Sequence, residues 1–297
     1  MGRLRERGPR RPRSRRHHLS SLATPLQPDQ QPGRWDGHVA VYELVFEPLT
    51  NTLAREAIEA LQVGPGMRLL DVGAGAGGAA LMAAGLGATV TAVDASPSMA
   101  RRIEERATSE GVPVAARPMD GAALKFPNGS FDAALSVFGI ILFPDPAGAL
   151  REIGRVLVPG GRVAIVTWTE PHRYELVGRL LAAISTAGTP SPPPAVPPAQ
   201  LRFREAAEFR ALFDRAGFEV ERITRSEKAL RAPSARWLAD RLEFAPGIGD
   251  MLAGQGERLP AVRRRFVEDL ERDQGMGEIA LGAIAFIGLA AAGSATR

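Results

Sequence analysis

The stretch Leu69–Gly78, LLDVGAGAGG, decides the fold that the sequence predicts. Apolar residues surround a single acid, Asp71, and four glycines follow it. This pattern indicates a buried parallel strand, a tight turn and the start of a helix. Glycine permits the unusual backbone angles of such a turn and lets a ligand approach the backbone closely. The helix that follows offers unpaired N–H groups and the positive end of its dipole to that ligand.

The glycine pattern alone leaves the ligand open. Gly73, Gly75 and Gly78 satisfy G-x-G-x-x-G, the fingerprint of dinucleotide-binding folds, and a turn without any ligand would look the same. A second strand, 90–93, ends at Asp94, whose carboxylate can accept hydrogen bonds from both hydroxyls of an adenosyl ribose. A nicotinamide nucleotide and S-adenosylmethionine both remain candidate ligands at this point.

Further strands add polar groups to the same predicted edge. A third strand leads to Asp120-Gly121, a fourth spans 131–137, and a fifth, 162–168, follows a Pro-Gly-Gly break. The carboxyl ends of parallel strands meet at one edge of an open α/β sheet, which is where ligands bind. That rim is expected to gather four side chains: Asp71, Asp94, Asp120 and Ser136.

Composition excludes several classes of site. The chain has 297 residues and is 45% hydrophobic, which suffices for one large core with a small cap. It has no cysteine, and therefore no disulfide, thiolate ligand or cysteine nucleophile. Four histidines cannot form a Cys/His zinc cluster, so no metal site is expected. The longest uncharged apolar stretch, 279–293, is too short to span a bilayer and indicates a buried strand, so a soluble, cytoplasmic protein is expected.

The net charge of +4 comes from the N-terminus. Residues 1–18 hold eight arginines and one glutamate, which leaves the rest of the chain at −3 and gives no sign of a nucleic-acid-binding body. Residues 1–33, rich in Arg, Pro and Gln, are predicted to form a disordered basic tail. A nucleic-acid-binding arm, a transit peptide and a twin-arginine export signal are alternatives. Export is disfavoured because no apolar segment follows Arg15-Arg16.

Four blocks lie in order along the chain: LDVGAGAGG at 70–78, VTAVDASPSM at 90–99, MDGAALKFPNGSFDAALSVFGIILF at 119–143 and ALREIGRVLVPGGRVAIVTW at 149–168. In this order and at this spacing they resemble the class I S-adenosylmethionine-dependent methyltransferases. Within that class the chain looks like the small-molecule enzymes related to ubiquinone/menaquinone C-methyltransferases. The likeness implies an α/β fold with a doubly wound, seven-stranded, mostly parallel sheet. Its last strand would be antiparallel, with helices on both faces and a small helical cap.

The resemblance also implies S-adenosyl-L-methionine as the cofactor. Asp71 would face the amino-acid end of the cofactor, Asp94 the ribose hydroxyls, and Asp120 with Gly121 the adenine. Ser136 would lie beside the sulfonium. The expected cofactor-binding residues are Asp71, Gly73, Ala74, Gly75, Asp94, Ala95, Met99, Asp120, Gly121 and Ser136.

The methyltransferase domain is expected to span 34–297. Its core would lie at about 62–170, with substrate-side elements at 34–61, 171–200 and 228–275. Transfer from a sulfonium is an in-line displacement that depends mainly on alignment of the two reactants. A base is needed only where the acceptor must lose a proton, and no catalytic residue is singled out among the four candidates His38, Tyr42, Glu47 and His172.

The expected reaction is methyl transfer to an O or C nucleophile of a small, apolar metabolite. No Asn/Asp-Pro-Pro-Tyr motif follows the fourth strand, which argues against a nucleic-acid amine as the acceptor. A nicotinamide-dependent oxidoreductase and a non-catalytic S-adenosylmethionine-binding protein are the alternatives. The sequence does not indicate an oligomeric state.

Overall fold

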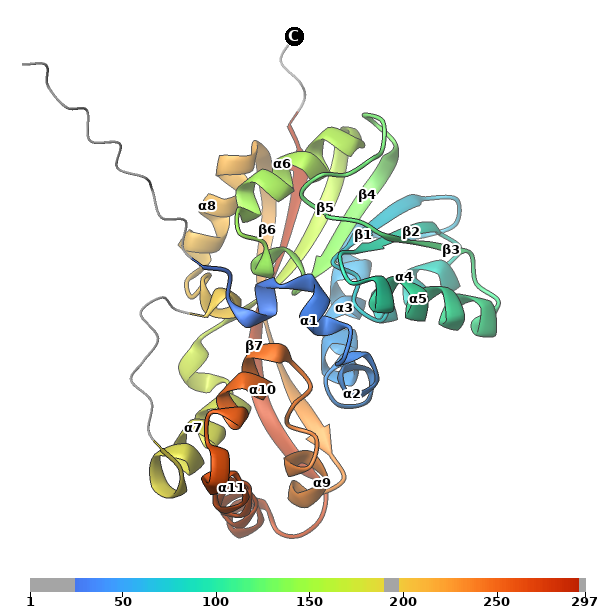
Figure 1. The fold of residues 1–297 in the computed structure, drawn as a ribbon. Coiled ribbons are helices and arrows are strands. Elements are labelled where there is room, and N and C mark those ends of the chain that lie inside the picture. The colour runs from blue at the N-terminus through green and yellow to red at the C-terminus, as the bar shows by residue number, and fades with distance from the viewer. Residues whose placement is uncertain (1–24, 190–197, 294–297) are drawn as a thin grey trace, which may run out of the picture.

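A seven-stranded sheet forms the centre of the computed structural model, which describes residues 25–189 and 198–293. The strands are β1 (Arg68–Val72), β2 (Thr89–Asp94), β3 (Val114–Pro118), β4 (Phe131–Val137), β5 (Leu157–Thr169), β6 (Phe218–Ala232) and β7 (Ile279–Ala292). They lie in the order β3-β2-β1-β4-β5-β7-β6 (Figure 1). Strands β1 to β5 pair in parallel, and β7 runs antiparallel to both β5 and β6. This confirms the sheet that the sequence predicted.

Helices cover both faces of the sheet (Figure 1). One face carries α3 (Glu47–Leu61), α4 (Gly78–Gly85) and α5 (Pro97–Glu110). The other face carries α6 (Pro146–Val156) and α8 (Ala206–Ala216). The remaining helices and 3-10 turns are η1 (Pro28–Gln30), α1 (Pro32–Trp35), α2 (Val39–Val45), η2 (Ile140–Leu142), η3 (Pro171–Arg173), α7 (Glu175–Ala187), η4 (Ala199–Leu201), α9 (Ala235–Ala239), α10 (Pro246–Ala253), η5 (Gly256–Arg258) and α11 (Leu259–Gln274).

The helix that follows β2 shows how sequence sets the bounds of these elements. The Ser96 hydroxyl accepts a hydrogen bond from the Met99 N–H at 3.1 Å, and Pro97 occupies the first helical position. Gly111 ends the helix with φ +66°. These signals fix the start of α5 directly after Asp94, and so hold that carboxylate at the edge of the sheet.

The long antiparallel pair β6–β7 extends the sheet beyond β5. β5 pairs with β7 from Arg162 to Thr169, whereas β6 and β7 continue together to the pair Ala232 and Ile279. The chain between these two residues forms α9, α10 and α11, and with α7 these helices make a cap away from β1–β4 (Figure 1). The apolar run 279–293, predicted to be a buried strand, provides β7.

Order in the N-terminal segment begins earlier than the sequence suggested. The predicted disordered tail reached residue 33, but 25–33 include η1 and the start of α1. These residues contact the insertion between β6 and β7, which supplies hydrogen-bond partners that no local pattern reveals. Residues 1–24 and most of the proline-rich segment at 190–198 fall outside the described residues. Among those described, no helix is both long enough and apolar enough to cross a membrane.

Candidate functional site

The turn after β1 brings two backbone segments into direct contact. Gly73 has φ +68° and Gly75 has φ +57°, in the left-handed region that favours glycine. A Cβ on Gly73 would lie 2.8 Å from the Cα of Gly139, which follows β4. Only glycine fits there, so the turn after β1 can lie directly against the segment that follows β4.

Asp94 is fixed at the end of β2 by two backbone donors. Its Oδ2 accepts a hydrogen bond from the Gly75 N–H at 2.9 Å, and its Oδ1 accepts one from the Ser96 N–H at 2.9 Å. Burial raises the pKa of Asp94 to about 6, and these two bonds oppose that rise. The carboxylate therefore faces the cavity in a set orientation with lone pairs to spare.

The segment after β3 forms the neighbouring wall. The Met119 N–H donates to the Asp94 carbonyl at 2.8 Å, and the Ala122 N–H donates to Asp120 Oδ1 at 2.9 Å. A Cβ on Gly121 would lie 2.5 Å from Val72 Cγ1, so this segment also packs tightly on the end of β1. The predicted residues that line the main cavity are Gly73, Gly75, Asp94, Ala95, Met99, Asp120 and Gly121.

Three predicted residues lie outside that cavity. Asp71 is 1% exposed, and together with Ala74 it lines a separate, smaller cavity of about 20 Å³. Asp71 Oδ2 has no hydrogen-bond partner among the described residues, and burial followed by the nearby Asp94 charge raises the pKa of Asp71 to about 7. The Ser136 hydroxyl donates to the Val72 carbonyl at 2.7 Å and accepts from the Ile140 N–H at 3.0 Å. Ser136 therefore braces β1 against the turn after β4, and its expected place beside the sulfonium stays a prediction.

One cavity of about 860 Å³ runs from the strand edge to an aromatic wall. Trp168 stacks on Phe138 with 3.8 Å between ring centroids and on Tyr174 with 5.2 Å. Phe46 stacks on Phe244 at 4.8 Å. The aromatic residues of this wall are Trp35, Tyr42, Phe46, Phe138, Trp168, Tyr174 and Phe244. They come from four separate parts of the chain, and most of them are hidden from outside solvent.

Phe138 occupies an unusual backbone conformation at the centre of this wall. Its φ is +59°, which is costly for a residue with a Cβ. Its N–H donates to the Val166 carbonyl at 3.1 Å, and its ring is stacked on Trp168. These contacts hold the ring on the cavity side of β4. Backbone strain of this kind is often found at functional sites.

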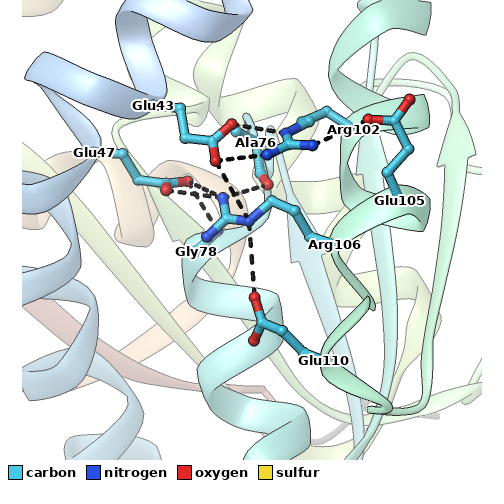
Figure 2. Close-up of polar contacts among 8 residues, drawn as sticks. All are labelled: Glu43, Glu47, Ala76, Gly78, Arg102, Glu105, Arg106 and Glu110. Carbon is cyan, nitrogen blue, oxygen red and sulfur yellow. Dashed lines mark hydrogen bonds and ion pairs between the residues drawn. The ribbon is translucent and has the colours of Figure 1, made fainter. Parts of the chain in front are cut away.

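The N-terminal segment 25–46, called here the strap, is bound to the turn after β2 and to α5. Asp36 Oδ1 accepts from the Ser96 hydroxyl at 2.6 Å, next to Asp94. Figure 2 shows Glu43 of α2 facing Arg102 of α5, with Nε–Oε2 at 2.7 Å. In the adjoining helix α3, Glu47 pairs with Arg106 at 2.8 Å and accepts from the Gly78 N–H at the start of α4 (Figure 2).

The strap is also bound to the cap. Arg34 forms a two-point pair with Asp250 of α10, one of whose bonds measures 2.7 Å. Asp29 Oδ1 accepts from the Gly247 N–H at 2.7 Å, and His38 Nδ1 lies 2.8 Å from the Glu243 carbonyl oxygen. The strap thus bridges the two sides of the cavity, and α1 lies between the sheet edge and α10 (Figure 1).

The four candidate bases fall in different places. Tyr42 lines the cavity, and a Cβ on Gly75 would lie 3.4 Å from its hydroxyl. Glu47 is committed to Arg106 and Gly78, His38 faces the Glu243 carbonyl, and His172 is exposed on η3. Tyr42 is therefore the candidate that the structure brings to the cavity.

Sequence patterns missed several cavity residues. Asp29 and Gln200 line it and are joined by a hydrogen bond of 2.5 Å from Gln200 Nε2 to Asp29 Oδ2. Asp29 lies in the stretch predicted to be disordered, and Gln200 follows the proline-rich segment. No three His, Asp or Glu side chains gather to hold a metal ion within the described ranges.

A family model described as a methyltransferase domain matches residues 70–165. The uncharacterized protein Rv1405c of Mycobacterium tuberculosis is 36% identical over 165 residues, covering 56% of this chain and 59% of that protein. The chain therefore spans less than two thirds of the length of this relative. Nocamycin O-methyltransferase of Saccharothrix syringae is 30% identical over 217 residues, covering 69% of this chain and 78% of that enzyme.

Comparison with solved structures agrees on the fold. The [4+2]-cyclase SpnF matches with a TM-score of 0.55 and 22% identity, over 90% of this chain and 97% of that one. Identity at that level shows a shared fold and does not extend to a shared reaction.

Proposed function

The chain belongs to the class I S-adenosylmethionine-dependent methyltransferase family, and we propose that it transfers a methyl group from S-adenosyl-L-methionine to an oxygen or carbon atom of a small, apolar metabolite. The observation that carries this proposal is the single cavity of about 860 Å³. It joins the acidic strand edge at Asp94 and Asp120 to an aromatic wall. A cavity of this kind suits two ligands of different character bound side by side.

The strand edge fits the cofactor by the chemistry of its groups. Asp94 has lone pairs available for the two ribose hydroxyls, and the turn at Gly73 and Gly75 admits a close ligand. Asp71 carries a buried oxygen without a partner, which suits the amino group at the other end of the cofactor. Asp120 and Gly121 would border the adenine. Seven of the ten predicted cofactor residues line this cavity, which supports the assignment.

The bound cofactor would supply an electrophilic methyl group, and the chain would supply alignment and exclusion of water. The aromatic wall and the strap enclose the acceptor side. Burial raises the pKa of Tyr42 above its ordinary value, so its hydroxyl stays protonated at neutral pH and can donate a hydrogen bond. Tyr42 is therefore better suited to orient a reactant than to remove a proton from one.

Calorimetry with S-adenosylhomocysteine and with NADH tests the cofactor assignment. We expect the protein to bind S-adenosylhomocysteine and to leave NADH unbound. The reverse result would replace this proposal with the oxidoreductase alternative.

A second experiment tests the reaction itself. The protein is incubated with S-adenosylmethionine carrying a labelled methyl group and with extract fractions of low molecular weight. Label is expected in an apolar fraction. Cofactor binding without transfer to any fraction would favour the non-catalytic alternative, which matters because a cyclase shares this fold.

A further inference from the structure

The acceptor side of the cavity holds a carboxylate among aromatic rings. Asp29 lines this side, and its backbone carbonyl accepts from Trp35 Nε1 at 3.0 Å. It is also close enough to Tyr174 for its charge to help raise the pKa of that phenol, after burial. A carboxylate in such surroundings calls for hydrogen-bond donors, because an unpartnered charge in an apolar site is costly.

The Asp29 side chain is held in place from two directions. Oδ1 accepts from the Gly247 N–H in the first turn of α10, and Oδ2 accepts from Gln200 Nε2. An ionised carboxylate offers about four acceptor positions, so these two bonds leave acceptor capacity for a ligand. Burial is the largest cause that raises the pKa of Asp29 above its ordinary value. The hydrogen bonds that Asp29 now accepts therefore do not fully replace those that water would make to its carboxylate.

The surrounding groups do not suit an anionic acceptor. Among the described residues that line the cavity, the basic ones are Arg151 and Arg155, both on α6. Arg155 is bound to Glu152 and to the carbonyls of Leu124 and Phe126, and Arg151 reaches the Arg215 carbonyl. Arg34, near Asp29, is paired with Asp250. A carboxylate or phosphate beside Asp29 would therefore meet a like charge without a cation to balance it.

The rings do not suit a cationic acceptor either. A cation binds best to the open face of an indole. Trp168 is already stacked on Phe138 and Tyr174, and Phe46 and Phe244 stack on each other. The second indole, Trp35, meets His38 and Tyr42 in T-shaped ring contacts. Rings arranged in this way instead favour a flat, uncharged π-system that packs among them.

We propose that this side of the cavity takes a flat, uncharged aromatic or conjugated acceptor whose hydroxyl group donates a hydrogen bond to the carboxylate of Asp29. This inference rests on the proposed function and narrows it to hydroxylated acceptors. Asp29 is the residue that selects and orients the acceptor through its hydroxyl.

A pair of probes with the same ring system, one with a hydroxyl and one with a methoxy group, tests the proposal. 2-Naphthol and 2-methoxynaphthalene share a ring system, and only the first can donate a hydrogen bond. Their affinities for the protein saturated with S-adenosylhomocysteine are measured by calorimetry. We expect 2-naphthol to bind at least about tenfold more tightly, because a hydrogen bond to a charged group contributes that much. Equal affinities would overturn the proposal, and so would tighter binding of 2-naphthylmethylammonium than of 2-naphthol.

A matched pair of variants assigns the preference to one residue. Asp29→Asn keeps the size of the side chain and can still accept from the Gly247 N–H, while the Gln200 amide can rotate to meet the new amide. We expect this variant to lose the tenfold preference and to keep its affinity for S-adenosylhomocysteine. Asp240→Asn, at an exposed position that ends α9, should keep the preference. A preference that survives in Asp29→Asn refutes the assignment.

The two proposals fail in different ways. Wild-type protein that binds S-adenosylhomocysteine but shows no preference for the hydroxyl refutes this inference alone. Protein that does not bind S-adenosylhomocysteine at all refutes the proposed function.

Discussion

The two halves of the cavity are built in opposite ways. The proposed cofactor half, lined by Gly73, Gly75, Asp94, Ala95, Met99, Asp120 and Gly121, comes from one continuous stretch of chain and three adjacent strands. The acceptor half is assembled from the strap, the ends of β4 and β5, α7, η4 and the insertion between β6 and β7. The first half depends on local turns and strand ends, and the second on packing between distant segments.

Because of this difference, the two halves tolerate different substitutions. The cofactor half contains positions where a single added methyl group would collide with backbone, such as Gly73. The acceptor half is held by ring stacking and by hydrogen bonds at the margins of the strap, which can change one at a time. We therefore expect substitutions to separate cofactor binding from acceptor binding.

Replacing Asp94 should give the largest effect and should act on the cofactor half alone. Asp94→Ala removes the proposed acceptor of both ribose hydroxyls, and we expect the affinity for S-adenosylhomocysteine to fall roughly hundredfold, measured by calorimetry. Asp132→Ala is the control, because Asp132 pairs with Arg68 where β4 and β1 begin, away from the carboxyl end of β2 where Asp94 lies. Unchanged affinity in Asp94→Ala would show that the ligand does not use this edge.

Removing the Phe244 ring should act on the acceptor half alone. Phe244→Ala leaves Phe46 without its stacking partner, and we expect the free energy of unfolding to fall by about 2 kcal/mol, since a buried ring is lost beside an existing cavity. Affinity for 2-naphthol should fall about tenfold with cofactor affinity retained. Leu270→Ala in α11 is the control, because Leu270 is equally buried but does not line the cavity. Equal loss of both affinities in Phe244→Ala would mean that the halves are not independent.

The buried Asp71 predicts a pH dependence of stability in the cofactor half. An acid whose pKa rises on folding binds its proton more tightly in the folded state, so its contribution to stability falls as pH rises from about 4 to about 7. Asp71→Asn does not titrate. From pH 5 to pH 8, wild type should therefore lose about 2–3 kcal/mol of unfolding free energy relative to this variant, measured by urea unfolding. A difference that stays constant with pH would contradict the raised pKa.

Breaking the Arg34–Asp250 pair should have the smallest effect. This exposed pair joins the strap to α10, and exposed pairs contribute little to overall stability. We expect Arg34→Ala to weaken 2-naphthol binding about threefold, without a measurable change in the thermal midpoint or in cofactor affinity. Arg236→Ala, which breaks the pair with Glu271 away from the strap, should leave both affinities unchanged. A large loss of cofactor affinity in Arg34→Ala would show that the strap also governs the other half.

The sequence predicted the fold and brought seven of the proposed cofactor residues to one cavity, because both depend on short-range patterns. Buried strands, the cap at Ser96 and the glycines after β1 each act within a few residues. The role of Ser136 stays a prediction, because a residue at the end of a strand can point either to a ligand or to a backbone neighbour. Its hydroxyl is used by Val72 and Ile140.

Asp29 could not be recognised because its partners, Gly247 and Gln200, lie far away in the chain. Its own neighbourhood is rich in Pro and Gln and carries no hydrophobic periodicity. The acceptor half depends on such long-range contacts throughout, and periodicity reports only which residues share a face of one element.

The insertion that forms much of the cap leaves and re-enters the sheet at two residues that face each other, Ala232 and Ile279. Residues 233–278 can therefore be regarded as a cassette whose two ends are already joined by the ladder that carries it. Exchange of this cassette between relatives would need no new connection through the core. Relatives with different cassettes would then differ in the proposed acceptor half and keep the same proposed cofactor half.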